Sequence, residues 1–126
     1  MALKVEVLVN DEYVCLRCSG LISLSELKKV YSNAIDSALE HSRPNILIDG
    51  MEVTGDLSTF ERYESSEFLA KEIRQRAAGK IKKIAVCGNE PPVDPKRFGE
   101  TVAVNRGVNA KVTTNLNEAI TWLLQK

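Results

Sequence analysis

The feature that most constrains the fold is a strict alternation of helix-like and strand-like segments after an opening pair of strands. In LKVEVLV (3–9), apolar residues alternate with charged ones, which is typical of a half-buried strand. A polar turn at 10–12 and a second strand at 13–18 complete an antiparallel hairpin. From residue 24 onward, helices and strands alternate, which predicts right-handed crossovers and mainly parallel pairing.

Capping residues mark the expected starts of the helices. Ser23 and Ser58 each precede a glutamate by three residues, the spacing of a capping box, in which a hydroxyl and a carboxylate satisfy free backbone N–H groups. Asp94 followed by Pro95 predicts a third start, because proline suits the first helical position. Within the second helix, ESSE at 64–67 interrupts the apolar period and predicts a kink or a break. The expected elements after the hairpin are helices at 24–41, 59–78 and 96–106, strands at 45–50, 83–88 and 110–114, and a last helix after 115.

The predicted fold class is α/β, in a single domain covering 1–126, because 126 residues are about one domain's worth of chain. The strands at 45–50 and 83–88 are almost entirely apolar, as in strands that helices cover on both faces of a parallel sheet. We therefore expect one mixed sheet of about five strands with four or five helices, in which both of these strands are buried.

The charge balance narrows the classes of partner. Lysine plus arginine and aspartate plus glutamate each total 17, so the net charge is zero, whereas nucleic-acid-binding domains usually carry a basic surplus. No apolar stretch approaches the roughly 20 residues that span a bilayer. The N-terminus lacks the charged start and long apolar block of a signal peptide. We expect a cytoplasmic protein that binds neither nucleic acid nor the membrane interior.

The cysteine and histidine content predicts no metal or cofactor. Cys15 and Cys18 have CxxC spacing, but they lie in the strand-like run YVCLRC, where side chains three positions apart point to opposite faces. A zinc or redox site needs both sulfurs on the same side. The single histidine, His41, falls in the last turn of the first helix and has no Cys or His cluster around it.

Motifs spread over nearly the whole chain resemble those of one known family. They are the opening hairpin, SGLISLSELKKVYSNAI (19–35), NILIDG (45–50) with MEVTGD (51–56), KIAVCG (83–88) and TTNLNEAITWL (113–123). Together they resemble the SpoIIAA-like family, which includes the STAS domains of anti-sigma-factor antagonists. The ending and the join between hairpin and first helix look most like its uncharacterised, stand-alone bacterial branch. The resemblance implies a SpoIIAA-like fold and a regulatory module that acts through protein contact.

The resemblance also implies a role for Ser58. In the anti-sigma antagonists, a serine at the start of the helix after the third strand is phosphorylated by a partner kinase, within the pattern Asp-Ser-Ser-Gly. Ser58 matches that position and Asp56 precedes it, but Leu57 and Thr59 depart from the pattern. The alternative is structural, because Ser58 has a complete role as the N-cap that pairs with Glu61.

The carboxyl ends of the parallel strands are the expected place for a site, because ligands of such sheets lie beyond these ends. Asp49 and Asn89 are expected at two of them. Asp49, Glu52 and Asp56 form an acidic cluster in the sequence, but their spacing matches no calcium or magnesium loop. We therefore name no metal ligand.

The stretch DPKRFGETVAVNRGVN (94–109) has two interpretations. Gly99 inside a helix costs about 1 kcal/mol relative to alanine, which suggests close approach by another element or by a ligand. Arg97 and Glu100 are i,i+3 neighbours that are expected to pair on the helix surface. Arg106 is expected to interact with the helix dipole at the C-terminus. The stretch is either a packing joint or a surface that holds an anion or a partner.

Three functions are consistent with the sequence. The leading one is a small non-catalytic regulatory or binding module, with a homodimer as a further expectation, that uses loop 50–58, the start of the second helix and loop 89–98. The first alternative is a carrier of a small apolar or lipid-like ligand. The second is an enzyme that uses carboxylates at the strand ends. The residues expected to line the carrier's cavity are Phe60, Tyr63, Phe68 and Phe98.

Overall fold

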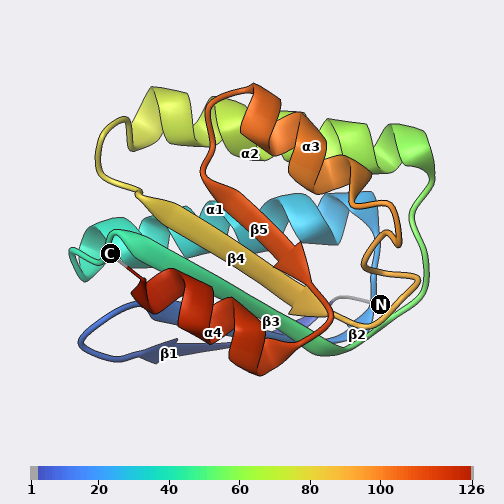
Figure 1. Ribbon diagram of the computed structural model, residues 1–126, viewed down its shortest axis with the longest axis horizontal. Helices are drawn as coiled ribbons and strands as arrows, with labels where there is room; N and C mark the ends of the chain where they lie inside the picture. Colours follow the sequence, from blue (N-terminus) through green and yellow to red (C-terminus); the bar gives the residue numbers. More distant parts are fainter. Residues whose placement is uncertain (1–2, 126) are drawn as a thin grey trace.

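The computed structural model of the chain describes residues 3–125 and has the predicted order of elements. After the opening hairpin, four helices alternate with three further strands, as Figure 1 shows. The strands are β1 (Lys4–Val9), β2 (Val14–Leu21), β3 (Asn45–Thr54), β4 (Lys83–Gly88) and β5 (Ala110–Thr113). The helices are α1 (Leu24–Glu40), α2 (Thr59–Arg76), α3 (Phe98–Asn105) and α4 (Leu116–Leu124).

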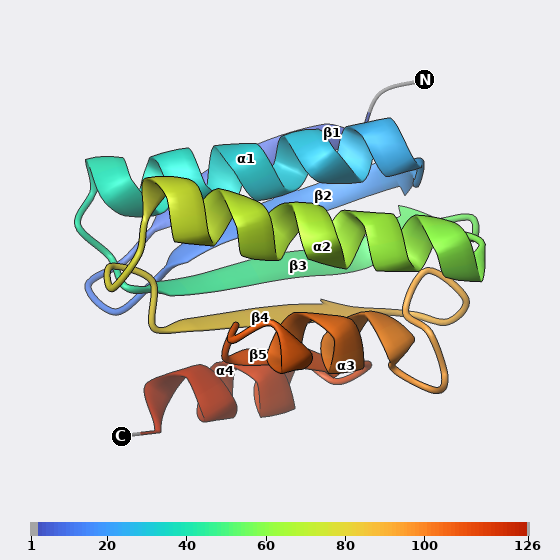
Figure 2. The same ribbon diagram turned by 90° about the horizontal axis from the view of Figure 1, so that it is seen from above.

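The strands form one mixed sheet in the order β1-β2-β3-β4-β5. β1 pairs with β2 in the antiparallel direction, and all later neighbours are parallel, which confirms the predicted pairing. Figure 2 shows α1 and α2 along one face of the sheet, α4 along the other, and α3 beside β5. The arrangement has three layers, with the sheet in the middle.

The interior strands are buried on both faces, as their apolar sequences predict. Ile46 and Ile84 lie in the core beneath α1 and α2, and Leu47 and Ala85 lie in the core beneath α4. All four are at most 2% exposed. Each face of the sheet therefore needs its own helical layer to keep these side chains out of water.

β2 and β3 extend beyond their predicted ends. The prediction that β3 stops at residue 50 is wrong, because the strand continues to Thr54 alongside a β2 that reaches Leu21. The pairing shifts in register between Arg17 and Ser19 and then resumes with Ser19 opposite Glu52. Polar residues and a glycine hide this extension in the sequence, since hydrogen bonds from the neighbouring strand form it rather than an apolar pattern.

α2 is continuous, so the predicted kink at 64–67 is absent. Ser65 and Ser66 are buried, and the Ser65 hydroxyl donates to the carbonyl of Arg62 at 3.0 Å. The small serine side chains let neighbouring elements pack closely where apolar residues would be expected. Among residues 3–125, no helix, including this 18-residue one, is apolar and long enough to cross a membrane.

α3 starts later than predicted. Asp94 is not its N-cap, because the helix begins at Phe98 and Arg97 occupies the cap position with a left-handed backbone, φ 52°. The Asp94 carboxylate instead accepts from the N–H groups of Lys96 and Phe98, at 3.1 and 2.9 Å. The aspartate thus stabilises a turn that precedes the helix. The predicted C-terminal stop is confirmed, because Gly107 follows α3 with φ 87°.

The cysteines are separated by the sheet, as their spacing predicts. Cys15 packs in the core beneath α4, and Cys18 packs in the core on the opposite face. Burial raises the pKa of Cys15 and of Cys18 to about 11, and that of Cys87 to about 12. All three thiols are buried and unoxidised.

These thiols predict a loss of stability in alkaline solution. A cysteine in the unfolded chain ionises near pH 8.5, whereas the folded chain keeps its thiols protonated until about pH 11. The free energy of unfolding should therefore fall as the pH rises from 8.5 towards 11, by up to about 1.4 kcal/mol per pH unit for each thiol. Urea unfolding at pH 8, 9 and 10, followed by Trp122 fluorescence, measures this slope.

Cys87→Ala provides the control for the alkaline effect. The variant should show a shallower pH slope than the unchanged chain, because one thiol no longer titrates on unfolding. A slope that does not change, or rapid reaction of the folded chain's thiols with a disulfide reagent at pH 8, would contradict the prediction.

Candidate functional site

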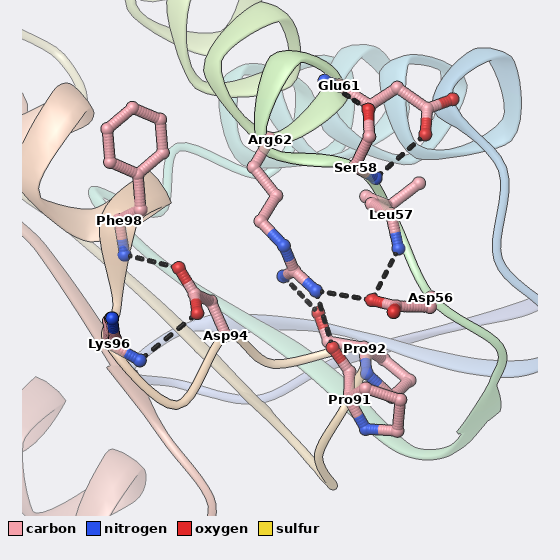
Figure 3. A network of polar contacts seen from close by, with 10 residues as sticks. All are labelled: Asp56, Leu57, Ser58, Glu61, Arg62, Pro91, Pro92, Asp94, Lys96 and Phe98. Carbon is pink, nitrogen blue, oxygen red and sulfur yellow. Dashed lines mark hydrogen bonds and ion pairs between the residues drawn. The ribbon is translucent and has the colours of Figure 1, made fainter.

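The surface expected at the carboxyl ends of the strands is organised by Arg62, which lies in the second turn of α2. Its guanidinium donates to the Asp56 carboxylate at 2.8 Å and to the carbonyls of Pro91 and Pro92 at 2.6 and 2.9 Å (Figure 3). The side chain is only 11% exposed. Arg62 therefore connects the loop before α2 to the loop after β4.

Arg62 is not among the residues that the sequence motifs single out. Its position one turn into a helix predicts an ordinary surface side chain. Only the folded chain brings the Pro91 and Pro92 carbonyls, which lie about thirty residues further along, to its guanidinium. The one available signal is the sequence Asp56-Leu57-Ser58, whose acid lies near enough in sequence to attract a cation on the following helix.

Ser58 is the N-cap of α2, and its predicted capping box is confirmed. Its hydroxyl accepts from the N–H of Glu61 at 3.1 Å, and the Glu61 carboxylate accepts from the N–H of Ser58 at 2.9 Å. Asp56 accepts from the N–H of Leu57 at 2.8 Å and also binds Arg62. Ser58 is exposed, so its hydroxyl is both accessible to solvent and part of the cap.

Asp94 stabilises the opposite side of this surface. Burial acts to raise its pKa, but the N–H donors of Phe98 and Lys96, together with the nearby Arg62, bring the pKa below its ordinary value. The carboxylate is thus charged at neutral pH and fixes the loop that Arg62 also binds (Figure 3). The loop after β4 is therefore held by one cationic side chain, Arg62, and one anionic side chain, Asp94.

Arg97 and Glu100 do not pair with each other, so that prediction is wrong. Arg97 Nε donates to the carbonyl of Val112 at 2.6 Å, and the Glu100 carboxylate accepts from the N–H of the same residue at 2.5 Å. Val112 lies in β5, an edge strand whose outer backbone groups have no strand partner. Arg97 and Glu100 provide hydrogen-bond partners for the C=O and N–H of Val112. Both side chains are therefore already engaged within the chain.

Gly99 is a packing joint between α3 and α2. A Cβ atom at this position would lie 3.0 Å from the hydroxyl oxygen of Ser66, closer than ordinary contact. The packing interpretation of this stretch accounts for the glycine, and the interpretation that Arg97 holds an anion does not fit its bond to Val112. Gly99 is the second residue of the helix, so it does not carry the full cost of a glycine in a helix interior.

Arg106 joins α3 to α2 at a distance from the Arg62 contacts. It donates to the hydroxyl of Tyr63 at 3.0 Å and to the Glu67 carboxylate at 3.2 Å, and its guanidinium lies over the Tyr63 ring. The hydrogen bond from Tyr63 lowers the pKa of Glu67 and raises that of the tyrosine. Arg106 also contacts α3 itself, but the distance from its guanidinium to the Val102 carbonyl is long, at 3.5 Å.

Asp49 and Asn89 do not form a common site with Asp56. Asp49 is buried within β3, not at a strand end, and its carboxylate lies 3.7 Å from Arg17 Nε. Asn89 follows β4 and donates to the carbonyl of Met51 at 2.8 Å. The carboxylates that an enzyme would need are thus engaged with different elements.

A small apolar cavity of about 110 Å³ lies between the sheet, α2 and α3. Gly50 and Gly88, which face each other across β3 and β4, contribute to its floor, and Arg62 contributes to its rim. None of the four aromatic residues expected to line a carrier's cavity does so. An engineered cavity that accepts benzene has about 150 Å³, so this space is too small for a lipid-like ligand.

Two exposed apolar side chains flank the turn that precedes α2. Phe60 is 67% exposed and Leu21 is 57% exposed. Leu21 lies against this turn, since a Cβ atom on Gly55 would be 2.8 Å from its methyl carbon. The exposure of Phe60 corrects the expectation that it lines a cavity. Leu21 beside Gly55 and Phe60, two residues after Ser58, are thus both exposed to water.

By sequence, the chain matches no family profile and no curated protein. By structure, it is similar to an anti-sigma factor antagonist from Mycobacterium paratuberculosis, with a TM-score of 0.63 and 17% identity over 98% of this chain and 96% of that one. It is also similar to an uncharacterised DUF3478 protein with a SpoIIAA-like fold from Shewanella loihica, with a TM-score of 0.55 and 17% identity over 97% and 94% of the two chains. The chain therefore has the SpoIIAA-like fold that its motifs predict.

Proposed function

We propose that the chain is a small non-catalytic regulatory module that binds a partner protein. Its binding surface consists of Leu21, residues 55–58, Phe60 and the loop 89–97. The observation that carries the proposal is the exposure of Phe60, two residues after Ser58, and of Leu21 beside Gly55, where Arg62 fixes the neighbouring loops. Exposed aromatic side chains on an ordered surface are typical of protein interfaces.

The engagement of the charged groups favours binding over catalysis. Asp94, Glu61 and Glu100 each accept backbone N–H groups, which holds them as structural anions rather than as acids or bases available to a substrate. His41 lies at the end of α1 and contacts the carbonyl of Ser37 in its own helix. Similarity of fold to an anti-sigma factor antagonist supports the same class of function.

We further propose that phosphorylation of Ser58 controls this surface. A phosphate on Ser58 would add up to about two negative charges beside Asp56, at the N-terminus of α2. Arg62, one turn further along α2, already binds Asp56 and the carbonyls of Pro91 and Pro92. A phosphate that competes for Arg62 would loosen the loop 89–97. The conformation of the partner-binding surface would then change, because this loop is part of it.

Replacement of Phe60 tests the binding surface. Affinity capture from extracts of the source cells, with mass spectrometry, identifies the partner of the unchanged chain. Phe60→Ala should weaken its binding by at least about tenfold, because aromatic anchors carry much of the energy of an interface. The fold should be unaffected, since the ring is mainly in water.

Val104→Ala, on the 50%-exposed apolar residue of α3, is the matched control. Equal binding by both variants, or capture of no partner, would contradict the proposal.

Two substitutions at Ser58 separate the switch from the cap. Ser58→Ala removes the cap and should lower the free energy of unfolding by about 1 kcal/mol while partner binding persists. Ser58→Asp keeps an N-cap oxygen and adds charge, so it should retain stability and change the affinity for the partner. Thermal melts and titration calorimetry measure the two properties. If neither variant changes affinity, the residue is only a cap.

The Arg62 contacts predict a local loss of order. Arg62→Gln removes charge-assisted bonds to both loops, each typically worth about 1.5–3 kcal/mol. Amide hydrogen exchange in 89–97 should accelerate by at least about tenfold, with little change in α1 and β3. Arg74→Gln, at an exposed arginine of the same helix, is the control. Uniform acceleration over the whole chain would mean that Arg62 serves global stability instead.

A further inference from the structure

The two edge strands of the sheet, β1 and β5, differ in whether side chains bind their outer backbone groups. At the β5 edge, Arg97 and Glu100 bind the outer carbonyl and N–H of Val112, so that edge is blocked by side chains. At the β1 edge, all six residues are exposed, and in the described part of the chain only β2 pairs with the strand. Unprotected edge strands are sites where another strand can add.

The outer edge of β1 combines free backbone groups with apolar side chains. Asn10 N donates to Tyr13 O, which makes these two residues a hydrogen-bonded pair at the turn. Hydrogen-bonded and non-hydrogen-bonded pairs alternate along an antiparallel ladder. Val9, Val7 and Val5 therefore occupy non-hydrogen-bonded pairs with β2, and their N–H and C=O groups point away from it. The same three valines are between 36% and 45% exposed.

We propose that this edge binds a second copy of the chain, with the two β1 strands antiparallel about a two-fold axis at Val7. In this register Val7 faces Val7 of the second copy, and Val5 faces Val9. Each of these pairs can exchange both backbone hydrogen bonds, because their free groups already point outward. The valine side chains share one face of the joined sheet, where they cover one another.

Charge complementarity supports the same register. Lys4 lies opposite Asn10 of the second copy and beside the Asp11 and Glu12 that follow it. Within residues 3–125, none of these three charged side chains forms an ion pair. A pairing centred on Glu6 is disfavoured, because it opposes two glutamates and offers backbone groups that already face β2. No residue of β1 belongs to the partner-binding surface, so the two proposals rest on different residues.

Cysteine cross-linking tests the register directly. Strands in a hydrogen-bonded pair place opposed Cα atoms about 5.5 Å apart, within the range of a disulfide. Val7→Cys should therefore form a covalent dimer under mild oxidation. Val5→Cys and Val9→Cys should each fail to cross-link alone and should cross-link when the two variants are mixed.

Leu8→Cys, one residue away and similarly exposed, is the control for random collision. Similar cross-linking of all single variants would overturn the proposal. The native cysteines are buried and do not compete.

Self-association without cross-linking provides the second test. Light scattering after size exclusion should give a concentration-dependent dimer for the unchanged chain. Val7→Lys places two like charges opposite each other and should weaken the dimer by at least about tenfold, with an unchanged circular dichroism spectrum. A monomer at high concentration for the unchanged chain, or a dimer that persists in Val7→Lys, overturns the proposed edge. Partner binding through Phe60 is measured separately, so failure of one proposal does not affect the other.

Discussion

The fold depends on the burial of β3 and β4 on both faces. Their apolar side chains alternate between the two cores, so neither face can be left to solvent without a cost of about 25 cal/mol per Å² of apolar surface. Helices on both sides follow from this requirement, and crossover connections join the parallel strands. The carboxyl ends of the strands then lie outside the helical layers, where loops are free to carry polar and exposed side chains.

Side chains replace missing backbone partners at the β5 edge of the sheet and beyond the carboxyl end of β4. Arg97 and Glu100 do so for Val112 at one edge, and Arg62 does so for the carbonyls of Pro91 and Pro92 beyond the strand ends. Pro92 and Val112 are half-buried, and their backbone groups would be costly without partners, so these charged residues stabilise places where regular pairing stops. Charged residues that looked like a ligand site in the sequence thus have structural roles.

Local signals predicted the elements, the Ser58 capping box and the opposed directions of Cys15 and Cys18. They failed where the decisive partner is distant in sequence. The extension of β3 depends on β2, and the roles of Arg62 and Glu100 depend on loops and strands that the chain supplies elsewhere. Asp94 followed by proline resembles a helix start in sequence, but its carboxylate instead closes a turn. Periodicity and capping describe neighbours in sequence, not in space.

The geometry of edge pairing has a consequence for the binding surface. A two-fold axis perpendicular to the sheet reverses the direction of every strand, so the carboxyl ends of the parallel strands in the two copies point in opposite directions. The surface around Ser58 and Phe60 lies at these ends, and none of its residues belongs to β1. A dimer of this kind would leave both surfaces free and present them at opposite ends of one continuous sheet. It could therefore join two partner molecules, and linked sites of this kind raise overall affinity without any new contact in either interface.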